Sequence, residues 1–179
     1  MNIKSKGKRH QGGVSTTNVV MSAYHGENYL VFPKILALHV PEGSVVADVT
    51  YGKGVFWRNV EKSKYVLKAT DIAQGVDCRQ LPYKAGSIDC VVLDPPYMEG
   101  FYRKDEAHRP GFKTHSAFRE FYSNGEMSEN EAKWHEAVHQ MYFKAGAEAH
   151  RVLRENGILI VKCQDQDSAN RQYLTHVYI

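Results

Sequence analysis

The residue types best suited to chemistry lie where an apolar run stops at a polar tetrapeptide. The run Ile88 to Leu93 predicts a buried strand, and Asp94-Pro95-Pro96-Tyr97 follows it directly. Neither proline can donate a ladder hydrogen bond, so the strand must end there and present Asp94 and Tyr97 at its carboxyl end. A carboxylate, a proline carbonyl and an aromatic face suit a flat ring that carries an amino group, because the two acceptors can take its N–H bonds while the ring stacks.

A second cluster of such residues is the stretch Asp48-Val49-Thr50-Tyr51-Gly52-Lys53-Gly54. It is expected to join a first strand, Val45 to Val49, to a helix over Val55 to Lys62. Gly52 and Gly54 would let the backbone approach a ligand closely. Asp71 ends a second expected strand, Tyr65 to Thr70, which is the position from which a carboxylate reaches ribose hydroxyls.

Two common nucleotide sites do not fit this glycine-bearing loop. A dinucleotide site needs a third glycine, and Trp57 stands at that position. A P-loop needs a lysine and then serine or threonine directly after its last glycine, and Val55-Phe56 follows Gly54 instead. A nucleoside without a pyrophosphate fits better, and S-adenosylmethionine is such a molecule. Asp48 would hold its ammonium group, Asp71 its ribose and Asp77 its adenine amino group.

The remaining sequence supplies the elements that must position these two clusters. Strands alternate with helices, which predicts a doubly wound, mostly parallel α/β sheet. Further expected elements are a short helix after Pro33, a short strand over Gly75 to Asp77, a helix from Ser128 to Glu155 with a Ser128–Glu131 capping box and a stop at Asn156-Gly157, a fifth strand over Ile158 to Val161, and a helix from Ser168 onward. The expected organisation is a flexible basic tail (1–18) and a single domain (19–179), with a long loop or lid over 98–128.

Composition places the chain among ordinary globular proteins. Its 179 residues suffice for one domain, with 42% hydrophobic and 24% charged residues. The net charge of +3 gives only a mild preference for an anionic partner. The three scattered cysteines form no C-x-x-C pair, which predicts a reducing, cytoplasmic setting. Neither a secretory signal nor a run of membrane-spanning length is present, so no membrane partner is expected.

Taken together, the two motifs resemble those of the amino-group DNA methyltransferases, which modify adenine N6 or cytosine N4. Asp94-Pro95-Pro96-Tyr97 is similar to that family's catalytic signature, and Asp48 to Gly54 is similar to its cofactor motif, with Thr50 where phenylalanine is common. The resemblance spans Val45 to Lys162. It implies a Rossmann-like fold, S-adenosylmethionine as cofactor and DNA as partner, often in restriction–modification.

The resemblance also implies site residues and a mechanism. Asp94, Pro95, Pro96 and Tyr97 would be catalytic, and Asp48, Thr50, Tyr51, Gly52, Gly54, Asp71 and Asp77 would bind the cofactor. The Asp94 carboxylate and Pro95 carbonyl would accept the two N–H bonds of the target amine, and Tyr97 would stack on the flipped-out base. Aspartate at the first signature position favours adenine N6 over cytosine N4.

Two departures from the family pattern accompany this resemblance. No separate target-recognition domain is visible. Such folds usually close with further strands, and the residues after Cys163 are too few for a helix plus a hairpin, so C-terminal strands are expected to be missing.

Three other functions stay open on the sequence alone. An RNA guanine-N2 methyltransferase can carry the same tetrapeptide, and a methyltransferase-like domain can bind nucleic acid without catalysis. The third is a zinc metalloprotease, because His135-Glu136-Ala137-Val138-His139 matches H-E-x-x-H. No third ligand is evident and that function leaves the double proline unexplained, so no metal is expected.

Overall fold

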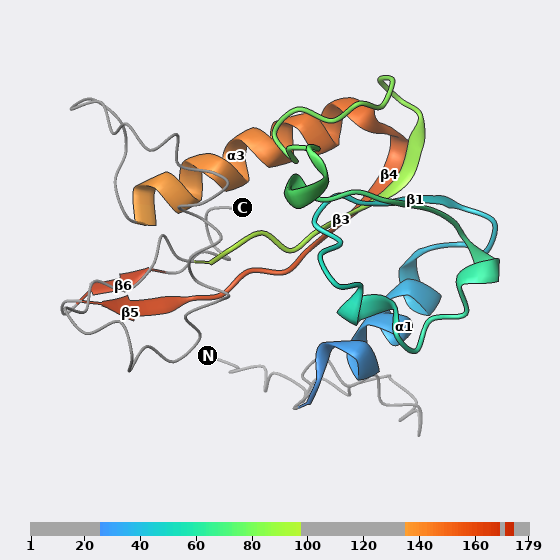
Figure 1. Ribbon diagram of the computed structural model, residues 1–179, viewed down its shortest axis with the longest axis horizontal. Coiled ribbons are helices and arrows are strands. Elements are labelled where there is room, and N and C mark those ends of the chain that lie inside the picture. The colour runs from blue at the N-terminus through green and yellow to red at the C-terminus, as the bar shows by residue number, and fades with distance from the viewer. Residues whose placement is uncertain (1–25, 98–134, 169–170, 174–179) are drawn as a thin grey trace, which may run out of the picture.

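The computed structural model describes residues 26–97, 135–168 and 171–173 of the chain (Figure 1). In chain order, its helices, short 3₁₀ turns and strands are α1 (Asn28–His39), β1 (Val45–Asp48), η1 (Val55–Trp57), η2 (Lys62–Lys64), β2 (Val66–Ala69), η3 (Ile72–Gln74), β3 (Ile88–Leu93), α3 (His135–Val152), β4 (Leu153–Val161), β5 (Gln166–Ser168) and β6 (Arg171–Tyr173). The expected tail 1–18, the expected loop 98–128 and the expected Ser128–Glu131 cap lie outside the described residues.

Four of the described strands form one parallel sheet in the order β2-β1-β3-β4. Asp48 at the end of β1 lies opposite Ala69 of β2 and Val92 of β3. The chain runs from β1 to β2 on one side and then returns to pair β3 on the other side of β1. The strand order therefore reverses between β1 and β3, and open parallel sheets bind ligands at the carboxyl ends of strands at such a point. The predicted α/β fold with a parallel sheet is confirmed, and it is compatible with a Rossmann-like arrangement.

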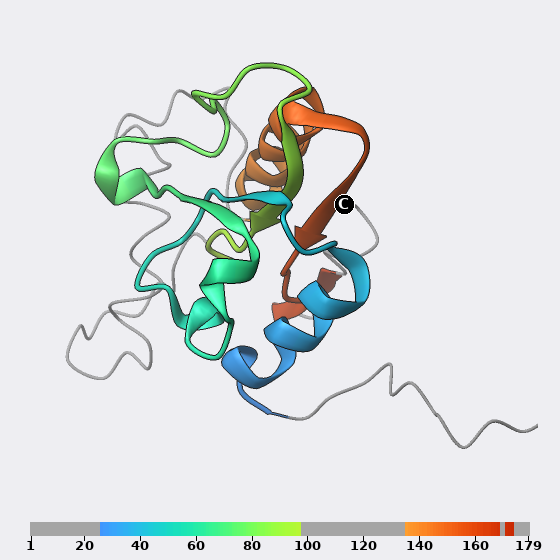
Figure 2. The same cartoon turned by 90° about the vertical axis from the view of Figure 1, so that its right-hand side faces the viewer.

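Helices cover both faces of this sheet (Figures 1 and 2). Alternate residues of β3 point to opposite faces: Val91 packs toward α3, and Val92 packs toward α1 and Trp57. The α3 residues in the core recur at spacings of three and four and include Val138, Met141, Tyr142, Ala145 and Ala149. Burial of each large apolar side chain contributes about 1.5–3 kcal/mol, so the two cores hold the sheet rigid.

The helix predicted over Val55 to Lys62 is wrong: the segment contains the 3₁₀ turn η1, and the next turn, η2, begins only at Lys62. Gly54 precedes η1 in the left-handed conformation, with φ of 66°. Val55, Phe56 and Trp57 have low helix propensity, and Trp57 turns inward to become 1% exposed. Tertiary burial of these aromatic side chains therefore replaces the regular helix.

Three further expectations about elements are corrected. Gly75 to Asp77 forms no strand, because Gly75 ends η3 with φ of 83° and Asp77 turns back to bind Arg79. The helix α3 ends at Val152, since Leu153 already pairs with Ile88. Asn156, with φ of 60°, lies instead at a register shift within β4.

The region after β4 also differs from expectation, because a helix was predicted from Ser168 onward. The described part of that region is the antiparallel hairpin β5–β6, in which Ser168 lies opposite Arg171. The hairpin strands pair with each other and add nothing to the four-stranded sheet. Figure 1 shows the hairpin beyond the carboxyl end of β4. The short helix predicted after Pro33 also differs from the structure: α1 begins at Asn28, five residues before Pro33.

The described segments contain no helix that combines the length and the apolar character needed to cross a membrane.

Candidate functional site at the carboxyl edge of the sheet

Asp94 lies half-buried immediately after β3, at the edge where the strand order reverses. Its backbone N–H donates to the Thr50 hydroxyl over 2.7 Å, which ties the end of β3 to the loop that follows β1. The N–H of Lys162 donates to the Leu93 carbonyl over 2.9 Å and continues the ladder to the end of β4. Pro95 is buried and Pro96 half-buried. The tetrapeptide is thus fixed by its neighbours on both sides, at the predicted position.

The side chains of Asp94, Tyr97 and Lys162 form one hydrogen-bonded cluster. The Tyr97 hydroxyl donates to Asp94 Oδ1, and Lys162 Nζ donates to the Tyr97 hydroxyl. Lys162 Nζ also lies 3.3 Å from Asp94 Oδ1 and 4.4 Å from the centroid of the Tyr97 ring. Burial raises the pKa of Asp94 above its usual value, and the charge and hydrogen bond of Lys162 oppose that rise.

Asp48 is a buried structural carboxylate, only 3% exposed. Its Oδ2 accepts a hydrogen bond from Trp57 Nε1 over 2.6 Å, and its Oδ1 accepts from the Thr50 N–H over 3.1 Å. Burial raises the pKa of Asp48 to about 6, although both hydrogen bonds act in the opposite direction. Asp48, which was predicted to bind the ammonium group, therefore uses both oxygens to hold the loop in place. Through Thr50 it also connects Trp57 to Asp94.

The two glycines of the predicted cofactor loop have different roles. Gly54 is buried under the ring of Tyr51, so that a Cβ at Gly54 would lie 2.5 Å from the Tyr51 hydroxyl. Gly52 has φ of 50°, and the nearest atom to a Cβ there would be the Thr50 carbonyl oxygen, 3.9 Å away. Of these two glycines, Gly52 is the one that combines a left-handed backbone with open space, as a backbone that approaches a ligand requires.

The predicted carboxylates Asp71 and Asp77 are both half-buried, and the structure separates their roles. Asp71 accepts from the Gly52 N–H and the Ala73 N–H, both over 2.9 Å, and so joins the glycine loop to the end of β2. Asp77 binds the guanidinium of Arg79, whose Nη2 lies 2.6 Å from Asp77 Oδ2. Burial alone would raise the pKa of Asp77, but the hydrogen bonds and charge of Arg79 outweigh burial and lower it.

These positions allow a test of whether S-adenosylmethionine fits the edge. The half-exposed Asp71 retains acceptor capacity on each carboxylate oxygen for ribose hydroxyls, and Gly52 offers open backbone beside it. These two residues fit the predicted roles. Asp48 has the same number of hydrogen bonds as Asp71 but is buried. Gly54 is covered by Tyr51, and Asp77 is bound by Arg79. The donor set thus fits at the ribose position.

Lys162 is the functional-site residue that the motifs did not single out. A usable signal was present, because Lys162 follows the apolar run Ile158 to Val161 just as Asp94 follows Ile88 to Leu93. Val161 pairs with Leu93 in the sheet, so the next residue of each strand lies at the same edge. A charged residue after each of two adjacent parallel strands predicts such a contact.

The histidine pair at His135 and His139 lies at the start of α3, and the side chain of His135 is outside what the structure describes. No group of three or more His, Cys, Asp or Glu side chains suited to a metal occurs within the described ranges.

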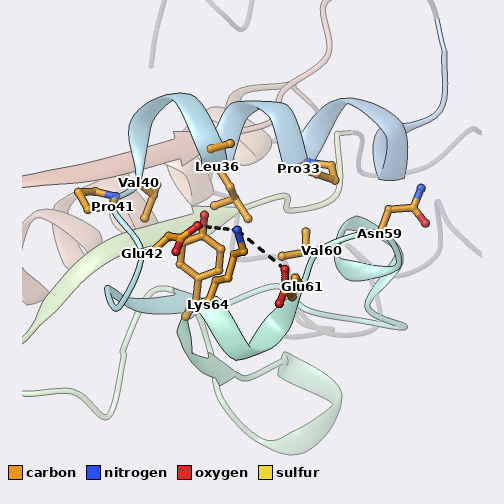
Figure 3. Close-up of a pocket in the computed structure, with 11 residues that line it drawn as sticks. Pro33, Leu36, Val40, Pro41, Glu42, Asn59, Val60, Glu61 and Lys64 are labelled. Carbon is orange, nitrogen blue, oxygen red and sulfur yellow. Dashed lines mark hydrogen bonds and ion pairs between the residues drawn. The ribbon is translucent and has the colours of Figure 1, made fainter.

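A hollow of about 290 Å³ lies at the opposite edge of the sheet, between α1 and η2 (Figure 3). Pro33, Leu36, Val40 and Val60 provide apolar lining. Lys64 stands at this hollow, 2.6 Å from Glu42 and 3.8 Å from Glu61. Glu42 and Lys64 precede β1 and β2, so this hollow is at the amino edge, away from Asp94.

In comparisons with known proteins, no family model and no curated protein sequence matches this chain.

Proposed function

We propose that this chain transfers a methyl group from S-adenosylmethionine to the exocyclic amino group of a DNA base, with adenine N6 preferred over cytosine N4. The observation that carries the proposal is the placement of Asp94. It is a half-buried carboxylate, followed by Pro95 and Tyr97, at the carboxyl edge where the strand order of a parallel sheet reverses.

The chemistry asked of Asp94 is to make a poor nucleophile react. The exocyclic amine of adenine has its lone pair delocalised into the ring. When the Asp94 carboxylate and the Pro95 carbonyl accept its two N–H bonds, the nitrogen is drawn toward tetrahedral geometry and its lone pair becomes available. The contacts strengthen as positive charge develops on nitrogen, so they stabilise the transition state more than the ground state.

The surrounding residues support this role by holding the acceptors still. The Thr50 hydroxyl fixes the Asp94 N–H, and the buried Asp48–Trp57 pair fixes Thr50. Acceptors that are already in position need not reorganise during the reaction, and this preorganisation is the main source of electrostatic catalysis. Tyr97 would stack on the extruded base, and stacking contributes about 1–3 kcal/mol toward the cost of base flipping.

Bound S-adenosylmethionine would supply the methyl group as a sulfonium. On this chain, Asp71 would accept hydrogen bonds from the ribose hydroxyls, and the open backbone at Gly52 would allow close approach. Asp48 contributes indirectly, since its oxygens hold the loop rather than the ligand.

The experiment that tests the function is transfer of tritiated methyl from S-adenosylmethionine to unmethylated genomic DNA, with total RNA in parallel. The label is located by digestion to nucleosides. Label in N6-methyladenine from DNA is the expected result. Label in RNA guanine would mean that the mechanism holds but that RNA is the substrate. Cofactor binding with no label in DNA or RNA would indicate a non-catalytic binder.

A further inference from the structure

Lys162 has a fixed backbone and a long side chain directed into the Asp94 cluster. Its N–H donates to the Leu93 carbonyl over 2.9 Å, and its carbonyl accepts from the Tyr142 hydroxyl of α3 over 3.2 Å. The four-carbon stem of a lysine is flexible, so the ammonium can move while its Cα stays in the sheet.

The Lys162 ammonium makes the two contacts that the proposed mechanism assigns to the substrate base. It lies 3.3 Å from Asp94 Oδ1, where the substrate amine would donate, and 4.4 Å from the centroid of the Tyr97 ring, where the base would stack. We propose that Lys162 is a substrate stand-in: it occupies Asp94 and Tyr97 while no base is bound and withdraws when a base enters. This inference rests on the proposed function.

The proposed reaction requires Lys162 to withdraw before the methyl group is transferred. The substrate nitrogen becomes positive as it gains the methyl group, and an ammonium on the same carboxylate oxygen would cancel the stabilisation that Asp94 provides. The Phe56 ring centroid already lies 5.9 Å from Lys162 Nζ. Phe56 therefore offers the ammonium a second aromatic face to which it can shift without leaving the site.

The stand-in also keeps Asp94 ready to accept a hydrogen bond. The titratable groups around Asp94 are Asp48 after β1, Tyr142 on α3, Lys162 after β4 and Tyr97 in its own loop. Lys162 is the only cation among these four residues. Without it, burial would favour the protonated form of Asp94, which is a weaker hydrogen-bond acceptor for an amine than the carboxylate.

Two variants at Lys162 separate these effects. In Lys162→Met the KM for a single-stranded oligonucleotide with one adenine should fall by roughly three- to ten-fold, because the competitor is removed. The acid limb of the pH profile of kcat/KM should move to higher pH. In Lys162→Arg the KM should rise, since a guanidinium can bind the carboxylate with two N–H groups and stack on Tyr97, and the acid limb should stay in place. Lys64→Met at the opposite edge is the matched control and should change neither quantity.

The outcomes that overturn the stand-in differ from the failure of the proposed function. A raised KM in Lys162→Met that Lys162→Arg restores would make Lys162 a substrate-binding residue instead. An unchanged KM with an unchanged acid limb would also overturn it. Absence of transfer by the wild-type protein would defeat the proposed function itself. In that case carbon-13 NMR can still follow the titration of the Asp94 carboxyl in wild type and in Lys162→Met. An unchanged midpoint would mean that Lys162 does not influence the protonation of Asp94.

Discussion

Two lysine–carboxylate pairs stand at opposite edges of the same sheet and differ in their surroundings. At the amino edge, Lys64 and Glu42 lie 2.6 Å apart, with side chains 41% and 67% exposed. At the carboxyl edge, Lys162 and Asp94 lie 3.3 Å apart, with side chains 34% and 24% exposed. The shorter pair is the more solvated one, so distance alone does not rank their importance.

The difference lies in what else holds each pair in place. At the carboxyl edge, backbone hydrogen bonds tie Asp94 to Thr50 and Lys162 to Leu93. At the amino edge, Lys64 is shared between two exposed glutamates, Glu42 and Glu61, at the rim of a hollow (Figure 3). Fixed, partly desolvated charges can do chemistry, whereas solvated pairs contribute mainly solubility.

The largest expected effect is at Asp94. Asp94→Ala should lower methyl transfer by about 10²–10³-fold, as for loss of one preorganised transition-state contact. The dissociation constant for S-adenosylmethionine should stay nearly constant. Radiolabel transfer and isothermal titration calorimetry measure the two quantities, with Glu42→Ala at the other edge as control. Loss of cofactor binding in Asp94→Ala would assign Asp94 to the cofactor instead.

Asp48 should give the next largest effect, on stability rather than on transfer. Its pKa is about 6 in the folded chain, above the ordinary value of 3.8. Between those values the folded state binds the proton more strongly than the unfolded state. The contribution of Asp48 to the free energy of unfolding therefore falls as pH rises from about 4 to about 6, by about 2–3 kcal/mol, and does not change further above that range.

Asp48→Asn should abolish most of that slope, because the amide does not titrate. Urea denaturation at pH 4.5 and pH 7 measures it in both proteins. Asp94 also has a raised pKa and adds a slope of the same sign, which the variant retains. An identical slope in wild type and Asp48→Asn would mean that Asp48 is already protonated, or never is, across this range.

Tyr97 distinguishes stacking from hydrogen bonding within the carboxyl-edge cluster. Tyr97→Ala should lower kcat/KM by about ten- to a hundred-fold, the value of one stacked base. Tyr97→Phe keeps the ring and loses only the hydroxyl that donates to Asp94, so its effect should be mild. Equal losses in the two variants would contradict a stacking role and assign the effect to the hydroxyl.

The sequence predicted the sheet better than the segments around it, for a physical reason. The predicted strands Ile88 to Leu93 and Val45 to Val49 are short, mostly apolar runs with buried residues on both faces, so their pattern was enough to predict strand and position. Val55 to Lys62 has no such constraint. Its structure depends on Trp57 reaching the distant Asp48 carboxylate, a contact that no local pattern contains.

The candidate site divides in the same way. The position of Asp94 followed from the strand that precedes it, and Asp71 followed from β2. The orientations of Asp48 and Asp77 did not, because each depends on a partner side chain, Trp57 or Arg79, that binds it in the folded chain. The position of a carboxylate at a strand end follows from the sequence pattern, whereas its hydrogen bonds depend on side-chain conformations that the pattern does not contain.

Asp71 and Asp77 can therefore be separated by cofactor affinity. Asp71→Ala should raise the dissociation constant for S-adenosylmethionine by about ten-fold, the value of one hydrogen bond to a charged group. Asp77→Ala should raise it less, since Arg79 already occupies that carboxylate. Calorimetric titration of both variants gives the comparison. An unchanged constant in Asp71→Ala would remove Asp71 from the ribose site.

The smallest expected effect is at the amino edge. Lys64→Met removes the cation shared by Glu42 and Glu61 but keeps an unbranched apolar stem at the hollow. Because this pair is solvated, the urea midpoint should stay within experimental error at moderate salt, and methyl transfer should not change. Lys162→Met makes the same chemical change at the carboxyl edge. A change in KM in Lys64→Met as large as the change in Lys162→Met would mean that net charge, rather than position, controls the reaction. Divergent results would show that a lysine acts on this chemistry only where the sheet holds it beside Asp94.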